Sequence, residues 1–347
     1  MRHRYVAVVF AMFAMIVLAS TMAAGQAPKP AAPGAKPATA KPYTPPKTSW
    51  GDPDLQGIYT SDDYIGLGLQ RNAQLGDRQF FTEEEIAQRE KNLANQRATD
   101  AQETVNPNAR VTAGPPGHWG ERARRSPRQT SLILDPPDGR LPETTAEAKT
   151  RKVGIGAGEG DPDAASWEDF TYYIRCITRG VAGSILPVIY GNGAQIVQSP
   201  GFVAITHEMV HEARIIPIGK TPHLGSAIKT YMGDSRGHWE GNTLVVETTN
   251  LLGNKTGLGG NGGGIPFSDS ARLVERFTRI SADTVQYELN VDDEKTYVRP
   301  IKISFPIRQE PGYQIFEYAC HEGNHGMHNQ LSAARAKEKA AAEAQKK

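Results

Sequence analysis

The stretch FVAITHEMVHEARIIPI, residues 202–218, is the longest apolar segment beyond the N-terminal one, and the fold prediction starts from it. Its odd positions are apolar or histidine, and its polar residues other than histidine stand at even positions (206, 208, 212 and 214), which is typical of a strand with one buried face. Phe202, Val210 and Ile216 break the pattern, and a helix with its apolar face along the same stretch is the alternative. We expect one long strand over residues 202–216, bounded by Pro200-Gly201 and Pro217.

The same stretch contains His207-Glu208-Met209-Val210-His211, which matches the zinc-protease pattern H-E-x-x-H. That chemistry needs the two histidines one turn apart on a helix. On a strand Glu208 points away from both histidines, and Arg214 and Pro217 stand where metzincins continue with Gly and His. We therefore expect no zinc-protease site. His207 and His211 should face the interior, either as hydrogen-bonded core residues or as acid/base groups or metal ligands.

From residue 194 onward, β-branched and aromatic runs alternate with turn formers. Short links between strands favour antiparallel neighbours, and a sheet that closes removes its exposed edges. We therefore predict a mainly β fold, an antiparallel meander closing to a barrel or strongly curved sheet, with a few peripheral helices. The expected strands, besides 202–216, are 130–134, 195–198, 243–249, 271–280, 284–291, 296–307 and 314–319, and the expected helices are 82–96 and 144–152.

Residues 1–24 read as a secretory signal peptide, with Arg2 and Arg4 before a short apolar run and small residues at its end. The run is short for a membrane anchor, which is the alternative. Residues 25–48 form a Pro/Ala-rich linker with too few large apolar side chains to fold. Residues 49–331 are expected to form a single β-rich domain, and 332–347 a solvated helical or disordered tail. The predicted location is periplasmic or secreted, without stable membrane insertion after cleavage.

The formal net charge of +1 gives no global attraction to nucleic acid, so we expect a small-molecule ligand and no nucleic-acid partner. Cys176 and Cys320 are the two cysteines of the chain. In an oxidising compartment we expect a disulfide between them, and two separate buried thiols are the alternative.

A second H-E-x-x-H match, His321-Glu322-Gly323-Asn324-His325, follows Cys320 directly. Gly323 and Gly326 each disfavour a helix by about 1 kcal/mol relative to alanine, so a zinc-protease helix is not expected here either. This polar cluster either caps the last strand or forms part of a site.

Combined with His211, the residues His321 and Glu322 would supply general acid/base chemistry, which makes these three the candidate catalytic residues. No cofactor is expected. If zinc were bound, the candidate ligands would be His207, His211 and His325.

Two further blocks supply candidate substrate-binding residues. Arg125 belongs to an arginine cluster at 122–128 that could hold a carboxylate or phosphate, or form a solvated, internally paired loop. Asp234 and His238 could pair beside Trp239, although residues 234–237 also suit a plain turn and Trp239 a barrel-rim core position. A catalytic triad through the intervening serine would lack the G-x-S-x-G elbow.

Four segments, DSRGHWEGNTLVVETTN (234–250), ERF (275–277), DDEKTYVRP (292–300) and EYACHEGN (317–324), resemble a large family of secreted bacterial proteins without established chemistry. The resemblance covers most of residues 49–336. Relatives often lack one histidine of each H-E-x-x-H match, which implies that His211, His321 and Glu322 are better candidates than a metal site. Gly57-Ile58-Tyr59 is also similar to the G-x-W opening of lipocalin barrels, with tyrosine in place of tryptophan.

These observations lead to three hypotheses. The first is an exported barrel that binds a small organic molecule in a polar-lined pocket, with hydrolase or lyase chemistry by histidine and glutamate. The second is a non-catalytic binding protein of the calycin type, and the third is a zinc-dependent metalloenzyme.

Overall fold

The computed structural model describes residues 43–100, 120–152, 154–156 and 164–346. The predicted signal peptide and most of the predicted linker lie outside these residues. The end of the linker contacts the domain, because the backbone N–H of Asp54 donates to the carbonyl of Pro46 (2.8 Å) and Lys47 bridges to Pro53. Within the described residues, no helix combines the length and the hydropathy needed to cross a membrane.

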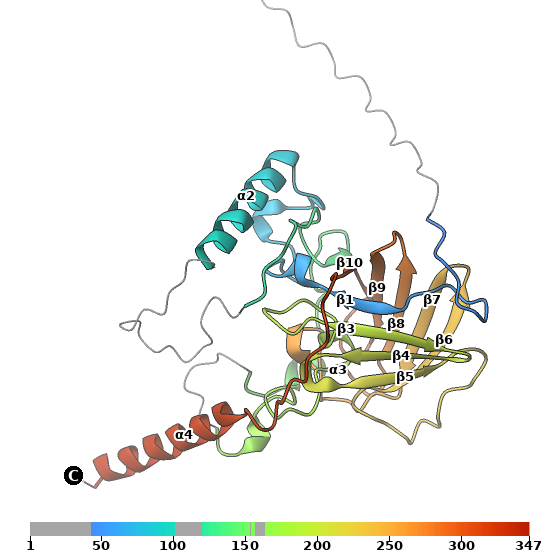
Figure 1. Cartoon of the computed structure of the whole chain (residues 1–347). Coiled ribbons are helices and arrows are strands. Elements are labelled where there is room, and N and C mark those ends of the chain that lie inside the picture. Colours follow the sequence, from blue (N-terminus) through green and yellow to red (C-terminus); the bar gives the residue numbers. More distant parts are fainter. Residues whose placement is uncertain (1–42, 101–119, 153, 157–163, 347) are drawn as a thin grey trace, which may run out of the picture. The chain divides into compact units, whose positions relative to one another are not determined.

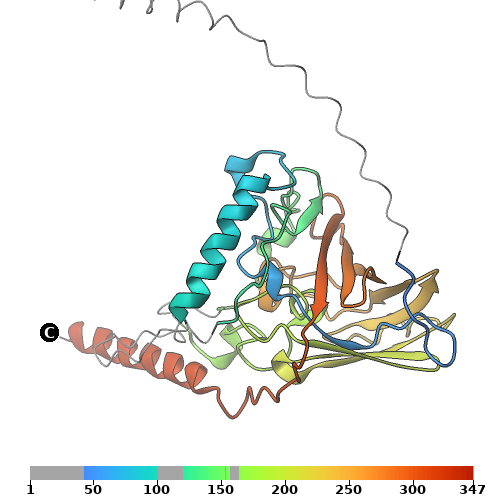
Figure 2. The same ribbon diagram turned by 45° about the horizontal axis from the view of Figure 1, so that its top comes forward.

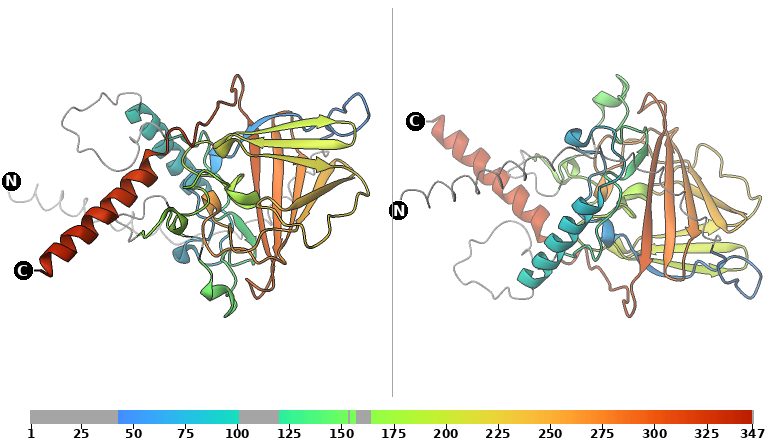
Figure 3. Two further views of the ribbon diagram at one scale, coloured as in Figure 1. Left: turned by 90° about the horizontal axis from the view of Figure 1, so that it is seen from below. Right: turned by 90° about the horizontal axis from the view of Figure 1, so that it is seen from above.

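Ten strands of the described residues form one antiparallel sheet that curls into a nearly closed barrel (Figures 1 and 3). The predicted fold class is therefore confirmed. One meander comprises β3 (Ala194–Ser199), β4 (Phe202–His207) and β5 (Ala213–Pro217). The other comprises β6 (Asp234–Glu240), β7 (Thr243–Thr249), β8 (Arg272–Arg279), β9 (Thr284–Asp292) and β10 (Ile301–Gln309). β1 (Gly57–Thr60) joins them by pairing with both β3 and β10, and β2 (Ile133–Asp135) pairs with β10.

The barrel approaches closure where the end of β5 meets β6. Ile218 forms a parallel bridge with Gly237, and the backbone N–H of Gly219 donates to the carbonyl of Gly237 at 2.8 Å. A Cβ atom at position 237 would lie 2.5 Å from the Cδ1 atom of Ile218. Glycine at this position therefore permits the two edge strands to meet, which reduces the exposed sheet edge.

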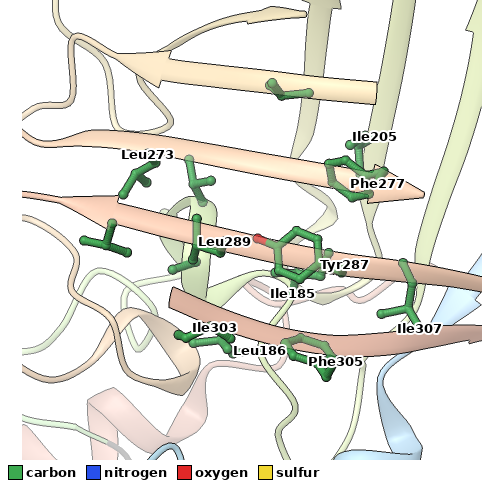
Figure 4. Packing of buried hydrophobic residues seen from close by; sticks show 14 of the residues in the cluster. Ile185, Leu186, Ile205, Leu273, Phe277, Tyr287, Leu289, Ile303, Phe305 and Ile307 are labelled. Atoms are coloured by element: carbon green, nitrogen blue, oxygen red, sulfur yellow. The ribbon is translucent and has the colours of Figure 1, made fainter. Parts of the chain in front are cut away.

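Side chains fill the interior of the barrel. Inward residues of β8, β9 and β10 pack as an aromatic row, with ring centroids 5.2 Å apart for Phe277 and Tyr287 and 5.4 Å apart for Tyr287 and Phe305. Figure 4 shows Ile185 and Leu186, which follow α3 (Gly180–Gly183), lying against this row. The interior is thus a packed core into which the α3 segment inserts, as in other small barrels.

The predicted single strand over 202–216 is wrong, because a turn at Glu208–Glu212 separates β4 from β5. The backbone N–H of His207 donates to the carbonyl of Glu212 (2.9 Å), and Val210 has a φ of 64°. The turn also changes which positions face inward: β4 buries its odd positions and β5 its even ones. Arg214, expected to face outward, is buried, whereas Ile215 is 63% exposed.

Three other predictions, each about a single segment, are wrong. Residues 234–237, which suited a turn, begin β6, where they pair with residues 246–249 of β7. Residues 314–319 form no strand of the sheet and have no regular secondary structure. The strand predicted over 296–307 begins later, because β10 begins at Ile301.

The two long helices, α2 (Glu83–Asp100) and α4 (His325–Ala344), are peripheral, as expected, whereas the short helix α3 is buried. A reciprocal capping box opens α2: the backbone N–H of Glu85 donates to Thr82 Oγ1 (3.2 Å), and that of Thr82 donates to Glu85 Oε2 (2.8 Å). α4 begins before the predicted tail, and Asn324 caps it. Figures 1 and 2 show α2 and α4 outside the barrel. Short 3₁₀ turns make up the remainder: η1 (Asp62–Tyr64), η2 (Ala73–Leu75), η4 (Ala148–Thr150), η5 (Trp167–Asp169), η6 (Met209–His211) and η7 (Gly260–Gly262).

Candidate functional site

Three segments meet at one end of the barrel: the β4–β5 turn at 208–212, the α3 segment at 171–193 and the C-terminal segment at 313–324. The Cys176–Cys320 disulfide, with a Cα–Cα distance of 5.7 Å, joins the last two, and this prediction is confirmed. Asn324 Nδ2 donates to the carbonyl of Ile174 at 2.7 Å. The backbone N–H of Phe316 donates to Glu208 Oε1 at 3.3 Å, which ties the C-terminal segment to the turn.

A cavity of about 460 Å³ lies between the α3 segment and the C-terminal segment. Its walls include three tyrosine side chains, the disulfide and the first turn of α4; we call it the tyrosine cavity. Its volume falls within the usual range for small-molecule sites. Residues lining it are Tyr173, Ile174, Cys176, Tyr190, Tyr318, Ala319, Cys320, Gly323, Asn324, Gly326, Met327 and Gln330.

Two of these tyrosines are held neutral. Burial raises the pKa of the Tyr173 hydroxyl above its usual value, and the neighbouring Tyr190 adds to the effect. The pKa of Tyr318 is also raised, mainly by burial and to a smaller extent by the neighbouring Tyr190. Neutral phenols can both donate and accept hydrogen bonds, so the cavity wall suits a polar organic molecule.

Arg179 lies within the electrostatic reach of the three cavity tyrosines and is fully buried. Burial lowers the pKa of its guanidinium to about 10, and the tyrosines and Glu212 oppose that shift. The side chain is therefore still charged at neutral pH. None of its three guanidinium nitrogens has a hydrogen-bond partner among the residues that the structure describes.

His207 faces the interior, as predicted, and is 1% exposed. Burial lowers its pKa to about 3, with smaller contributions from Arg214 and Arg179. The imidazole is therefore neutral at physiological pH. Arg214 forms a bidentate ion pair with Glu275, at 2.6 and 2.9 Å, and Tyr287 Oη donates to the same carboxylate at 3.1 Å.

Glu208, which was expected to have no role, is buried and lies near a half-buried pair of carboxyl groups, those of Asp62 and Glu121. Its Oε2 accepts a hydrogen bond from Tyr313 Oη at 2.5 Å. Asn192 Nδ2 donates to both Asp62 (2.9 Å) and Glu121 (3.2 Å). Burial, followed by the charge of Asp62, raises the pKa of Glu121 to about 8. Sequence reasoning missed this cluster because its members lie far apart along the chain.

The candidate catalytic residues do not form a buried site. His211 is exposed, contrary to the expectation that it faces inward, and its Nδ1 lies 3.2 Å from the carbonyl of Tyr318. His321 and Glu322 are also exposed. In the described chain, no hydrogen bond joins His211 to either of them. Their acid/base role stays a prediction.

The histidines of the two H-E-x-x-H matches form no metal site among the residues that the structure describes. His325 is exposed at the start of α4. Among the described residues, no group of three or more histidine, cysteine, aspartate or glutamate side chains is arranged to hold a metal ion. His207 and His211, at the two ends of the β4–β5 turn, differ in burial: the first is buried and the second exposed.

Asp234 and His238, which could have paired with each other, have other partners. Asp234 accepts from His223 Nδ1 (2.9 Å) and pairs with Arg236 (2.6 Å), whereas His238 pairs with Glu240. Trp239 packs partly buried against the core, which agrees with the barrel-rim alternative.

In the arginine cluster, Arg125 is exposed and its backbone N–H donates to Asp63. Its neighbours Arg122, Arg124 and Arg128 form ion pairs with acidic side chains of the chain itself. This arrangement agrees with the internally paired loop.

A search of protein-family models, curated proteins and solved structures finds no match to this chain. The resemblance to secreted bacterial proteins is therefore still an expectation, and the site is interpreted from its own geometry.

Proposed function

We propose that this protein is exported and binds a small organic molecule in the tyrosine cavity. The observation that carries the proposal is the cavity itself. Its volume of about 460 Å³ suits a small molecule, and its wall combines aromatic rings with the neutral hydroxyls of Tyr173 and Tyr318. Aromatic faces pack against apolar or planar groups, and the hydroxyls can fix a polar one.

The position of the cavity differs from that of a calycin lumen. The barrel interior is filled by Phe277, Tyr287 and Phe305 and by the side chains that follow α3. A ligand is therefore expected at the end of the barrel rather than inside it. The cavity is also framed by a covalent cross-link, Cys176–Cys320, which restricts the separation of its two walls.

Hydrolase or lyase chemistry by His211, His321 and Glu322 has less support. All three are exposed, and a general base needs to lie within hydrogen-bond reach of the reacting group. Binding without catalysis is the function that the geometry supports best.

The test is a small-molecule screen read by NMR on protein with ¹³C-labelled tyrosine rings. Ligands should shift the resonances of Tyr173, Tyr190 and Tyr318. Tyr59 and Tyr287, which are fully buried in the barrel, serve as internal controls and should not move. The proposal fails if hits shift the barrel tyrosines instead, or if a broad screen of polar aromatic and aliphatic compounds shifts none of the three cavity tyrosines.

A further inference from the structure

A second cluster of side chains lies outside the tyrosine cavity and combines three aromatic rings with two cations. The guanidinium carbon of Arg175 lies 4.3 Å from the ring centroid of Trp167 and 4.9 Å from that of Tyr172. Lys255 Nζ lies 5.2 Å from the centroid of Tyr172, and the ring centroids of Tyr172 and Tyr231 are 5.3 Å apart. None of these five residues lines the tyrosine cavity. We call them the aromatic–cation surface.

Segments far apart in the sequence carry this surface, and backbone contacts hold them in place. A capping box that starts at Ser166 opens η5, which carries Trp167. The backbone N–H of Ile177 donates to the carbonyl of Tyr172 at 2.8 Å and closes the turn that carries Arg175. The other two residues belong to the loops before β6 and after β7, which an isolated bridge joins. The five side chains are therefore held close together by the fold.

In the part of the chain that the structure describes, no carboxylate neutralises the two cations of the surface. Arg175 and Lys255 form no ion pair there, and neither side chain donates a hydrogen bond to a described residue. The carboxylate of Asp169, at the end of η5, accepts from the backbone N–H groups of Ala165 and Ser166 instead (2.7 and 2.8 Å). Cation–π contacts orient the two side chains but leave their positive charge without a counterion. An anionic group that reaches the surface can therefore pair with them.

The exposure and the chemistry of the surface define the partner that fits it. Trp167 is 49% exposed and the other four side chains are half-buried, so part of the surface is reached directly from solvent. Aromatic rings pack against flat apolar groups, and a guanidinium pairs with the two oxygens of a carboxylate. A uronic acid unit of a polysaccharide offers both, because its ring has apolar C–H faces and bears a carboxylate.

Two other anionic partners fit less well. A nucleic-acid binder with strong affinity makes about 6–10 phosphate contacts, and recognition of an anionic membrane takes about 4–8 clustered basic residues. The aromatic–cation surface supplies two cations, and the formal net charge of the whole chain is +1. A partner with fewer charges and more apolar surface per unit is therefore favoured.

We propose that the aromatic–cation surface binds an acidic polysaccharide. A sugar ring packs against the exposed part of Trp167, and carboxylates of the polysaccharide pair with Arg175 and Lys255. This inference goes beyond the proposed function and does not depend on it, because no residue of the surface lines the tyrosine cavity.

The test is calorimetric titration of the full mature chain, with its disulfide intact. The probes are two acidic oligosaccharides, oligogalacturonate and oligomannuronate, and a neutral maltooligosaccharide of the same length. At least one acidic probe should bind, and the neutral probe should not. Arg175→Gln combined with Lys255→Gln should weaken this binding by about tenfold or more, because charge-assisted hydrogen bonds are lost. Trp167→Ala should weaken it by about 2- to 10-fold through the lost ring contact.

The matched control combines Arg89→Gln with Lys91→Gln. It removes the same charge, and Arg89 also lies over an aromatic ring, 4.4 Å from the centroid of Phe81, but on α2. This control should bind the acidic probe as tightly as the unmodified chain does. If Arg175→Gln, next to the disulfide, lowers the melting temperature, Lys255→Gln alone keeps the test decisive and should weaken binding by about threefold.

Loss of binding in the surface variants, with none in the control, supports the inference. It is overturned if neither acidic probe binds, if the neutral probe binds equally well, or if the control loses as much affinity as the double variant. Tighter binding of a single-stranded oligodeoxynucleotide, or of phosphatidylglycerol vesicles, than of the acidic probes would also contradict it, because the partner would then belong to another class.

Discussion

Glu275→Gln is expected to be among the most destabilising isosteric changes in the barrel. Glu275 is fully buried and forms two hydrogen bonds with the guanidinium of Arg214, which is 3% exposed. The substitution preserves the shape of the side chain but leaves the charge of Arg214 without a counterion. Breaking a buried pair in this way costs about 3–5 kcal/mol. That is a large part of a typical unfolding free energy of roughly 5–15 kcal/mol.

The magnitude comes mainly from the charge and not from lost packing. Glutamine fills nearly the same volume, so no cavity opens, and its amide oxygen can still accept from Tyr287 Oη. Replacing both partners by apolar residues, as in Arg214→Met with Glu275→Leu, removes the uncompensated charge. The double variant should therefore be much closer to the unmodified protein, and replacing a buried pair in this way can even stabilise a protein by about 1–4 kcal/mol.

Urea-induced unfolding followed by circular dichroism, with the disulfide intact, measures these differences. Glu240→Gln is the matched control, because Glu240 pairs with Arg276 on the outside of the barrel and is 50% exposed. This control should leave the free energy of unfolding unchanged within error. The reasoning is refuted if Glu275→Gln costs less than about 1 kcal/mol, the range of exposed pairs.

Three other predictions concern the barrel-end site. Replacing both Cys176 and Cys320 by serine should lower the free energy of unfolding by about 5 kcal/mol, because the disulfide closes a loop of 144 residues in the unfolded chain; a loss near zero in urea unfolding would contradict this. Glu121 holds its proton more tightly when folded, so its contribution to stability should fall as pH rises from 4.5 to about 8, and Glu121→Gln should remove this slope. An unchanged slope would mean that Glu121 is not buried beside Asp62. The pH dependence from His207 has the opposite sign, because this histidine binds a proton more readily in the unfolded chain. Its contribution to the free energy of unfolding should rise between pH of about 3 and 6.5, and His207→Gln should flatten that rise. If the variant shows the same rise, a group other than His207 is responsible for it and the prediction is wrong.

The sequence predicted β7, β8 and β9 of the second meander well because their alternation is regular and their turns are short. The predicted strand 243–249 has the observed bounds of β7, and Gly241-Asn242 forms the turn before it. Alternation and turn-forming residues are local patterns, so they can be recognised without knowledge of the rest of the fold.

The β4–β5 hairpin was missed because the alternation was followed as one pattern, whereas the buried positions change from odd in β4 to even in β5. Val210 and Ile216 were treated as exceptions to one long strand, yet Ile216 faces inward because the turn shifts the buried positions from odd to even. These exceptions were the signal of the turn. The position of Arg214 follows from it, and so does the ion pair with Glu275.

The candidate site could be predicted only in part. The disulfide could be predicted because the chain has just two cysteines, and it brings the α3 and C-terminal segments together. The burial of Arg179 could not be predicted, because nothing in its local sequence distinguishes it from a surface arginine. Its environment depends on long-range packing of the 256–262 loop and the cavity tyrosines.

The central claim, that the tyrosine cavity binds a small molecule, is tested most directly by filling it. Gly326 lines the cavity, and a Cβ atom there meets no other heavy atom within 4 Å. Gly326→Phe should therefore fold normally and occupy the ligand's space. Gly225→Phe is the control, because Gly225 is equally open on an exposed loop. Calorimetric titration with a ligand found in the NMR screen should show at least about tenfold weaker binding to Gly326→Phe, about the size of one lost hydrogen bond, and unchanged binding to Gly225→Phe. Equal affinity for the two variants would contradict the claim.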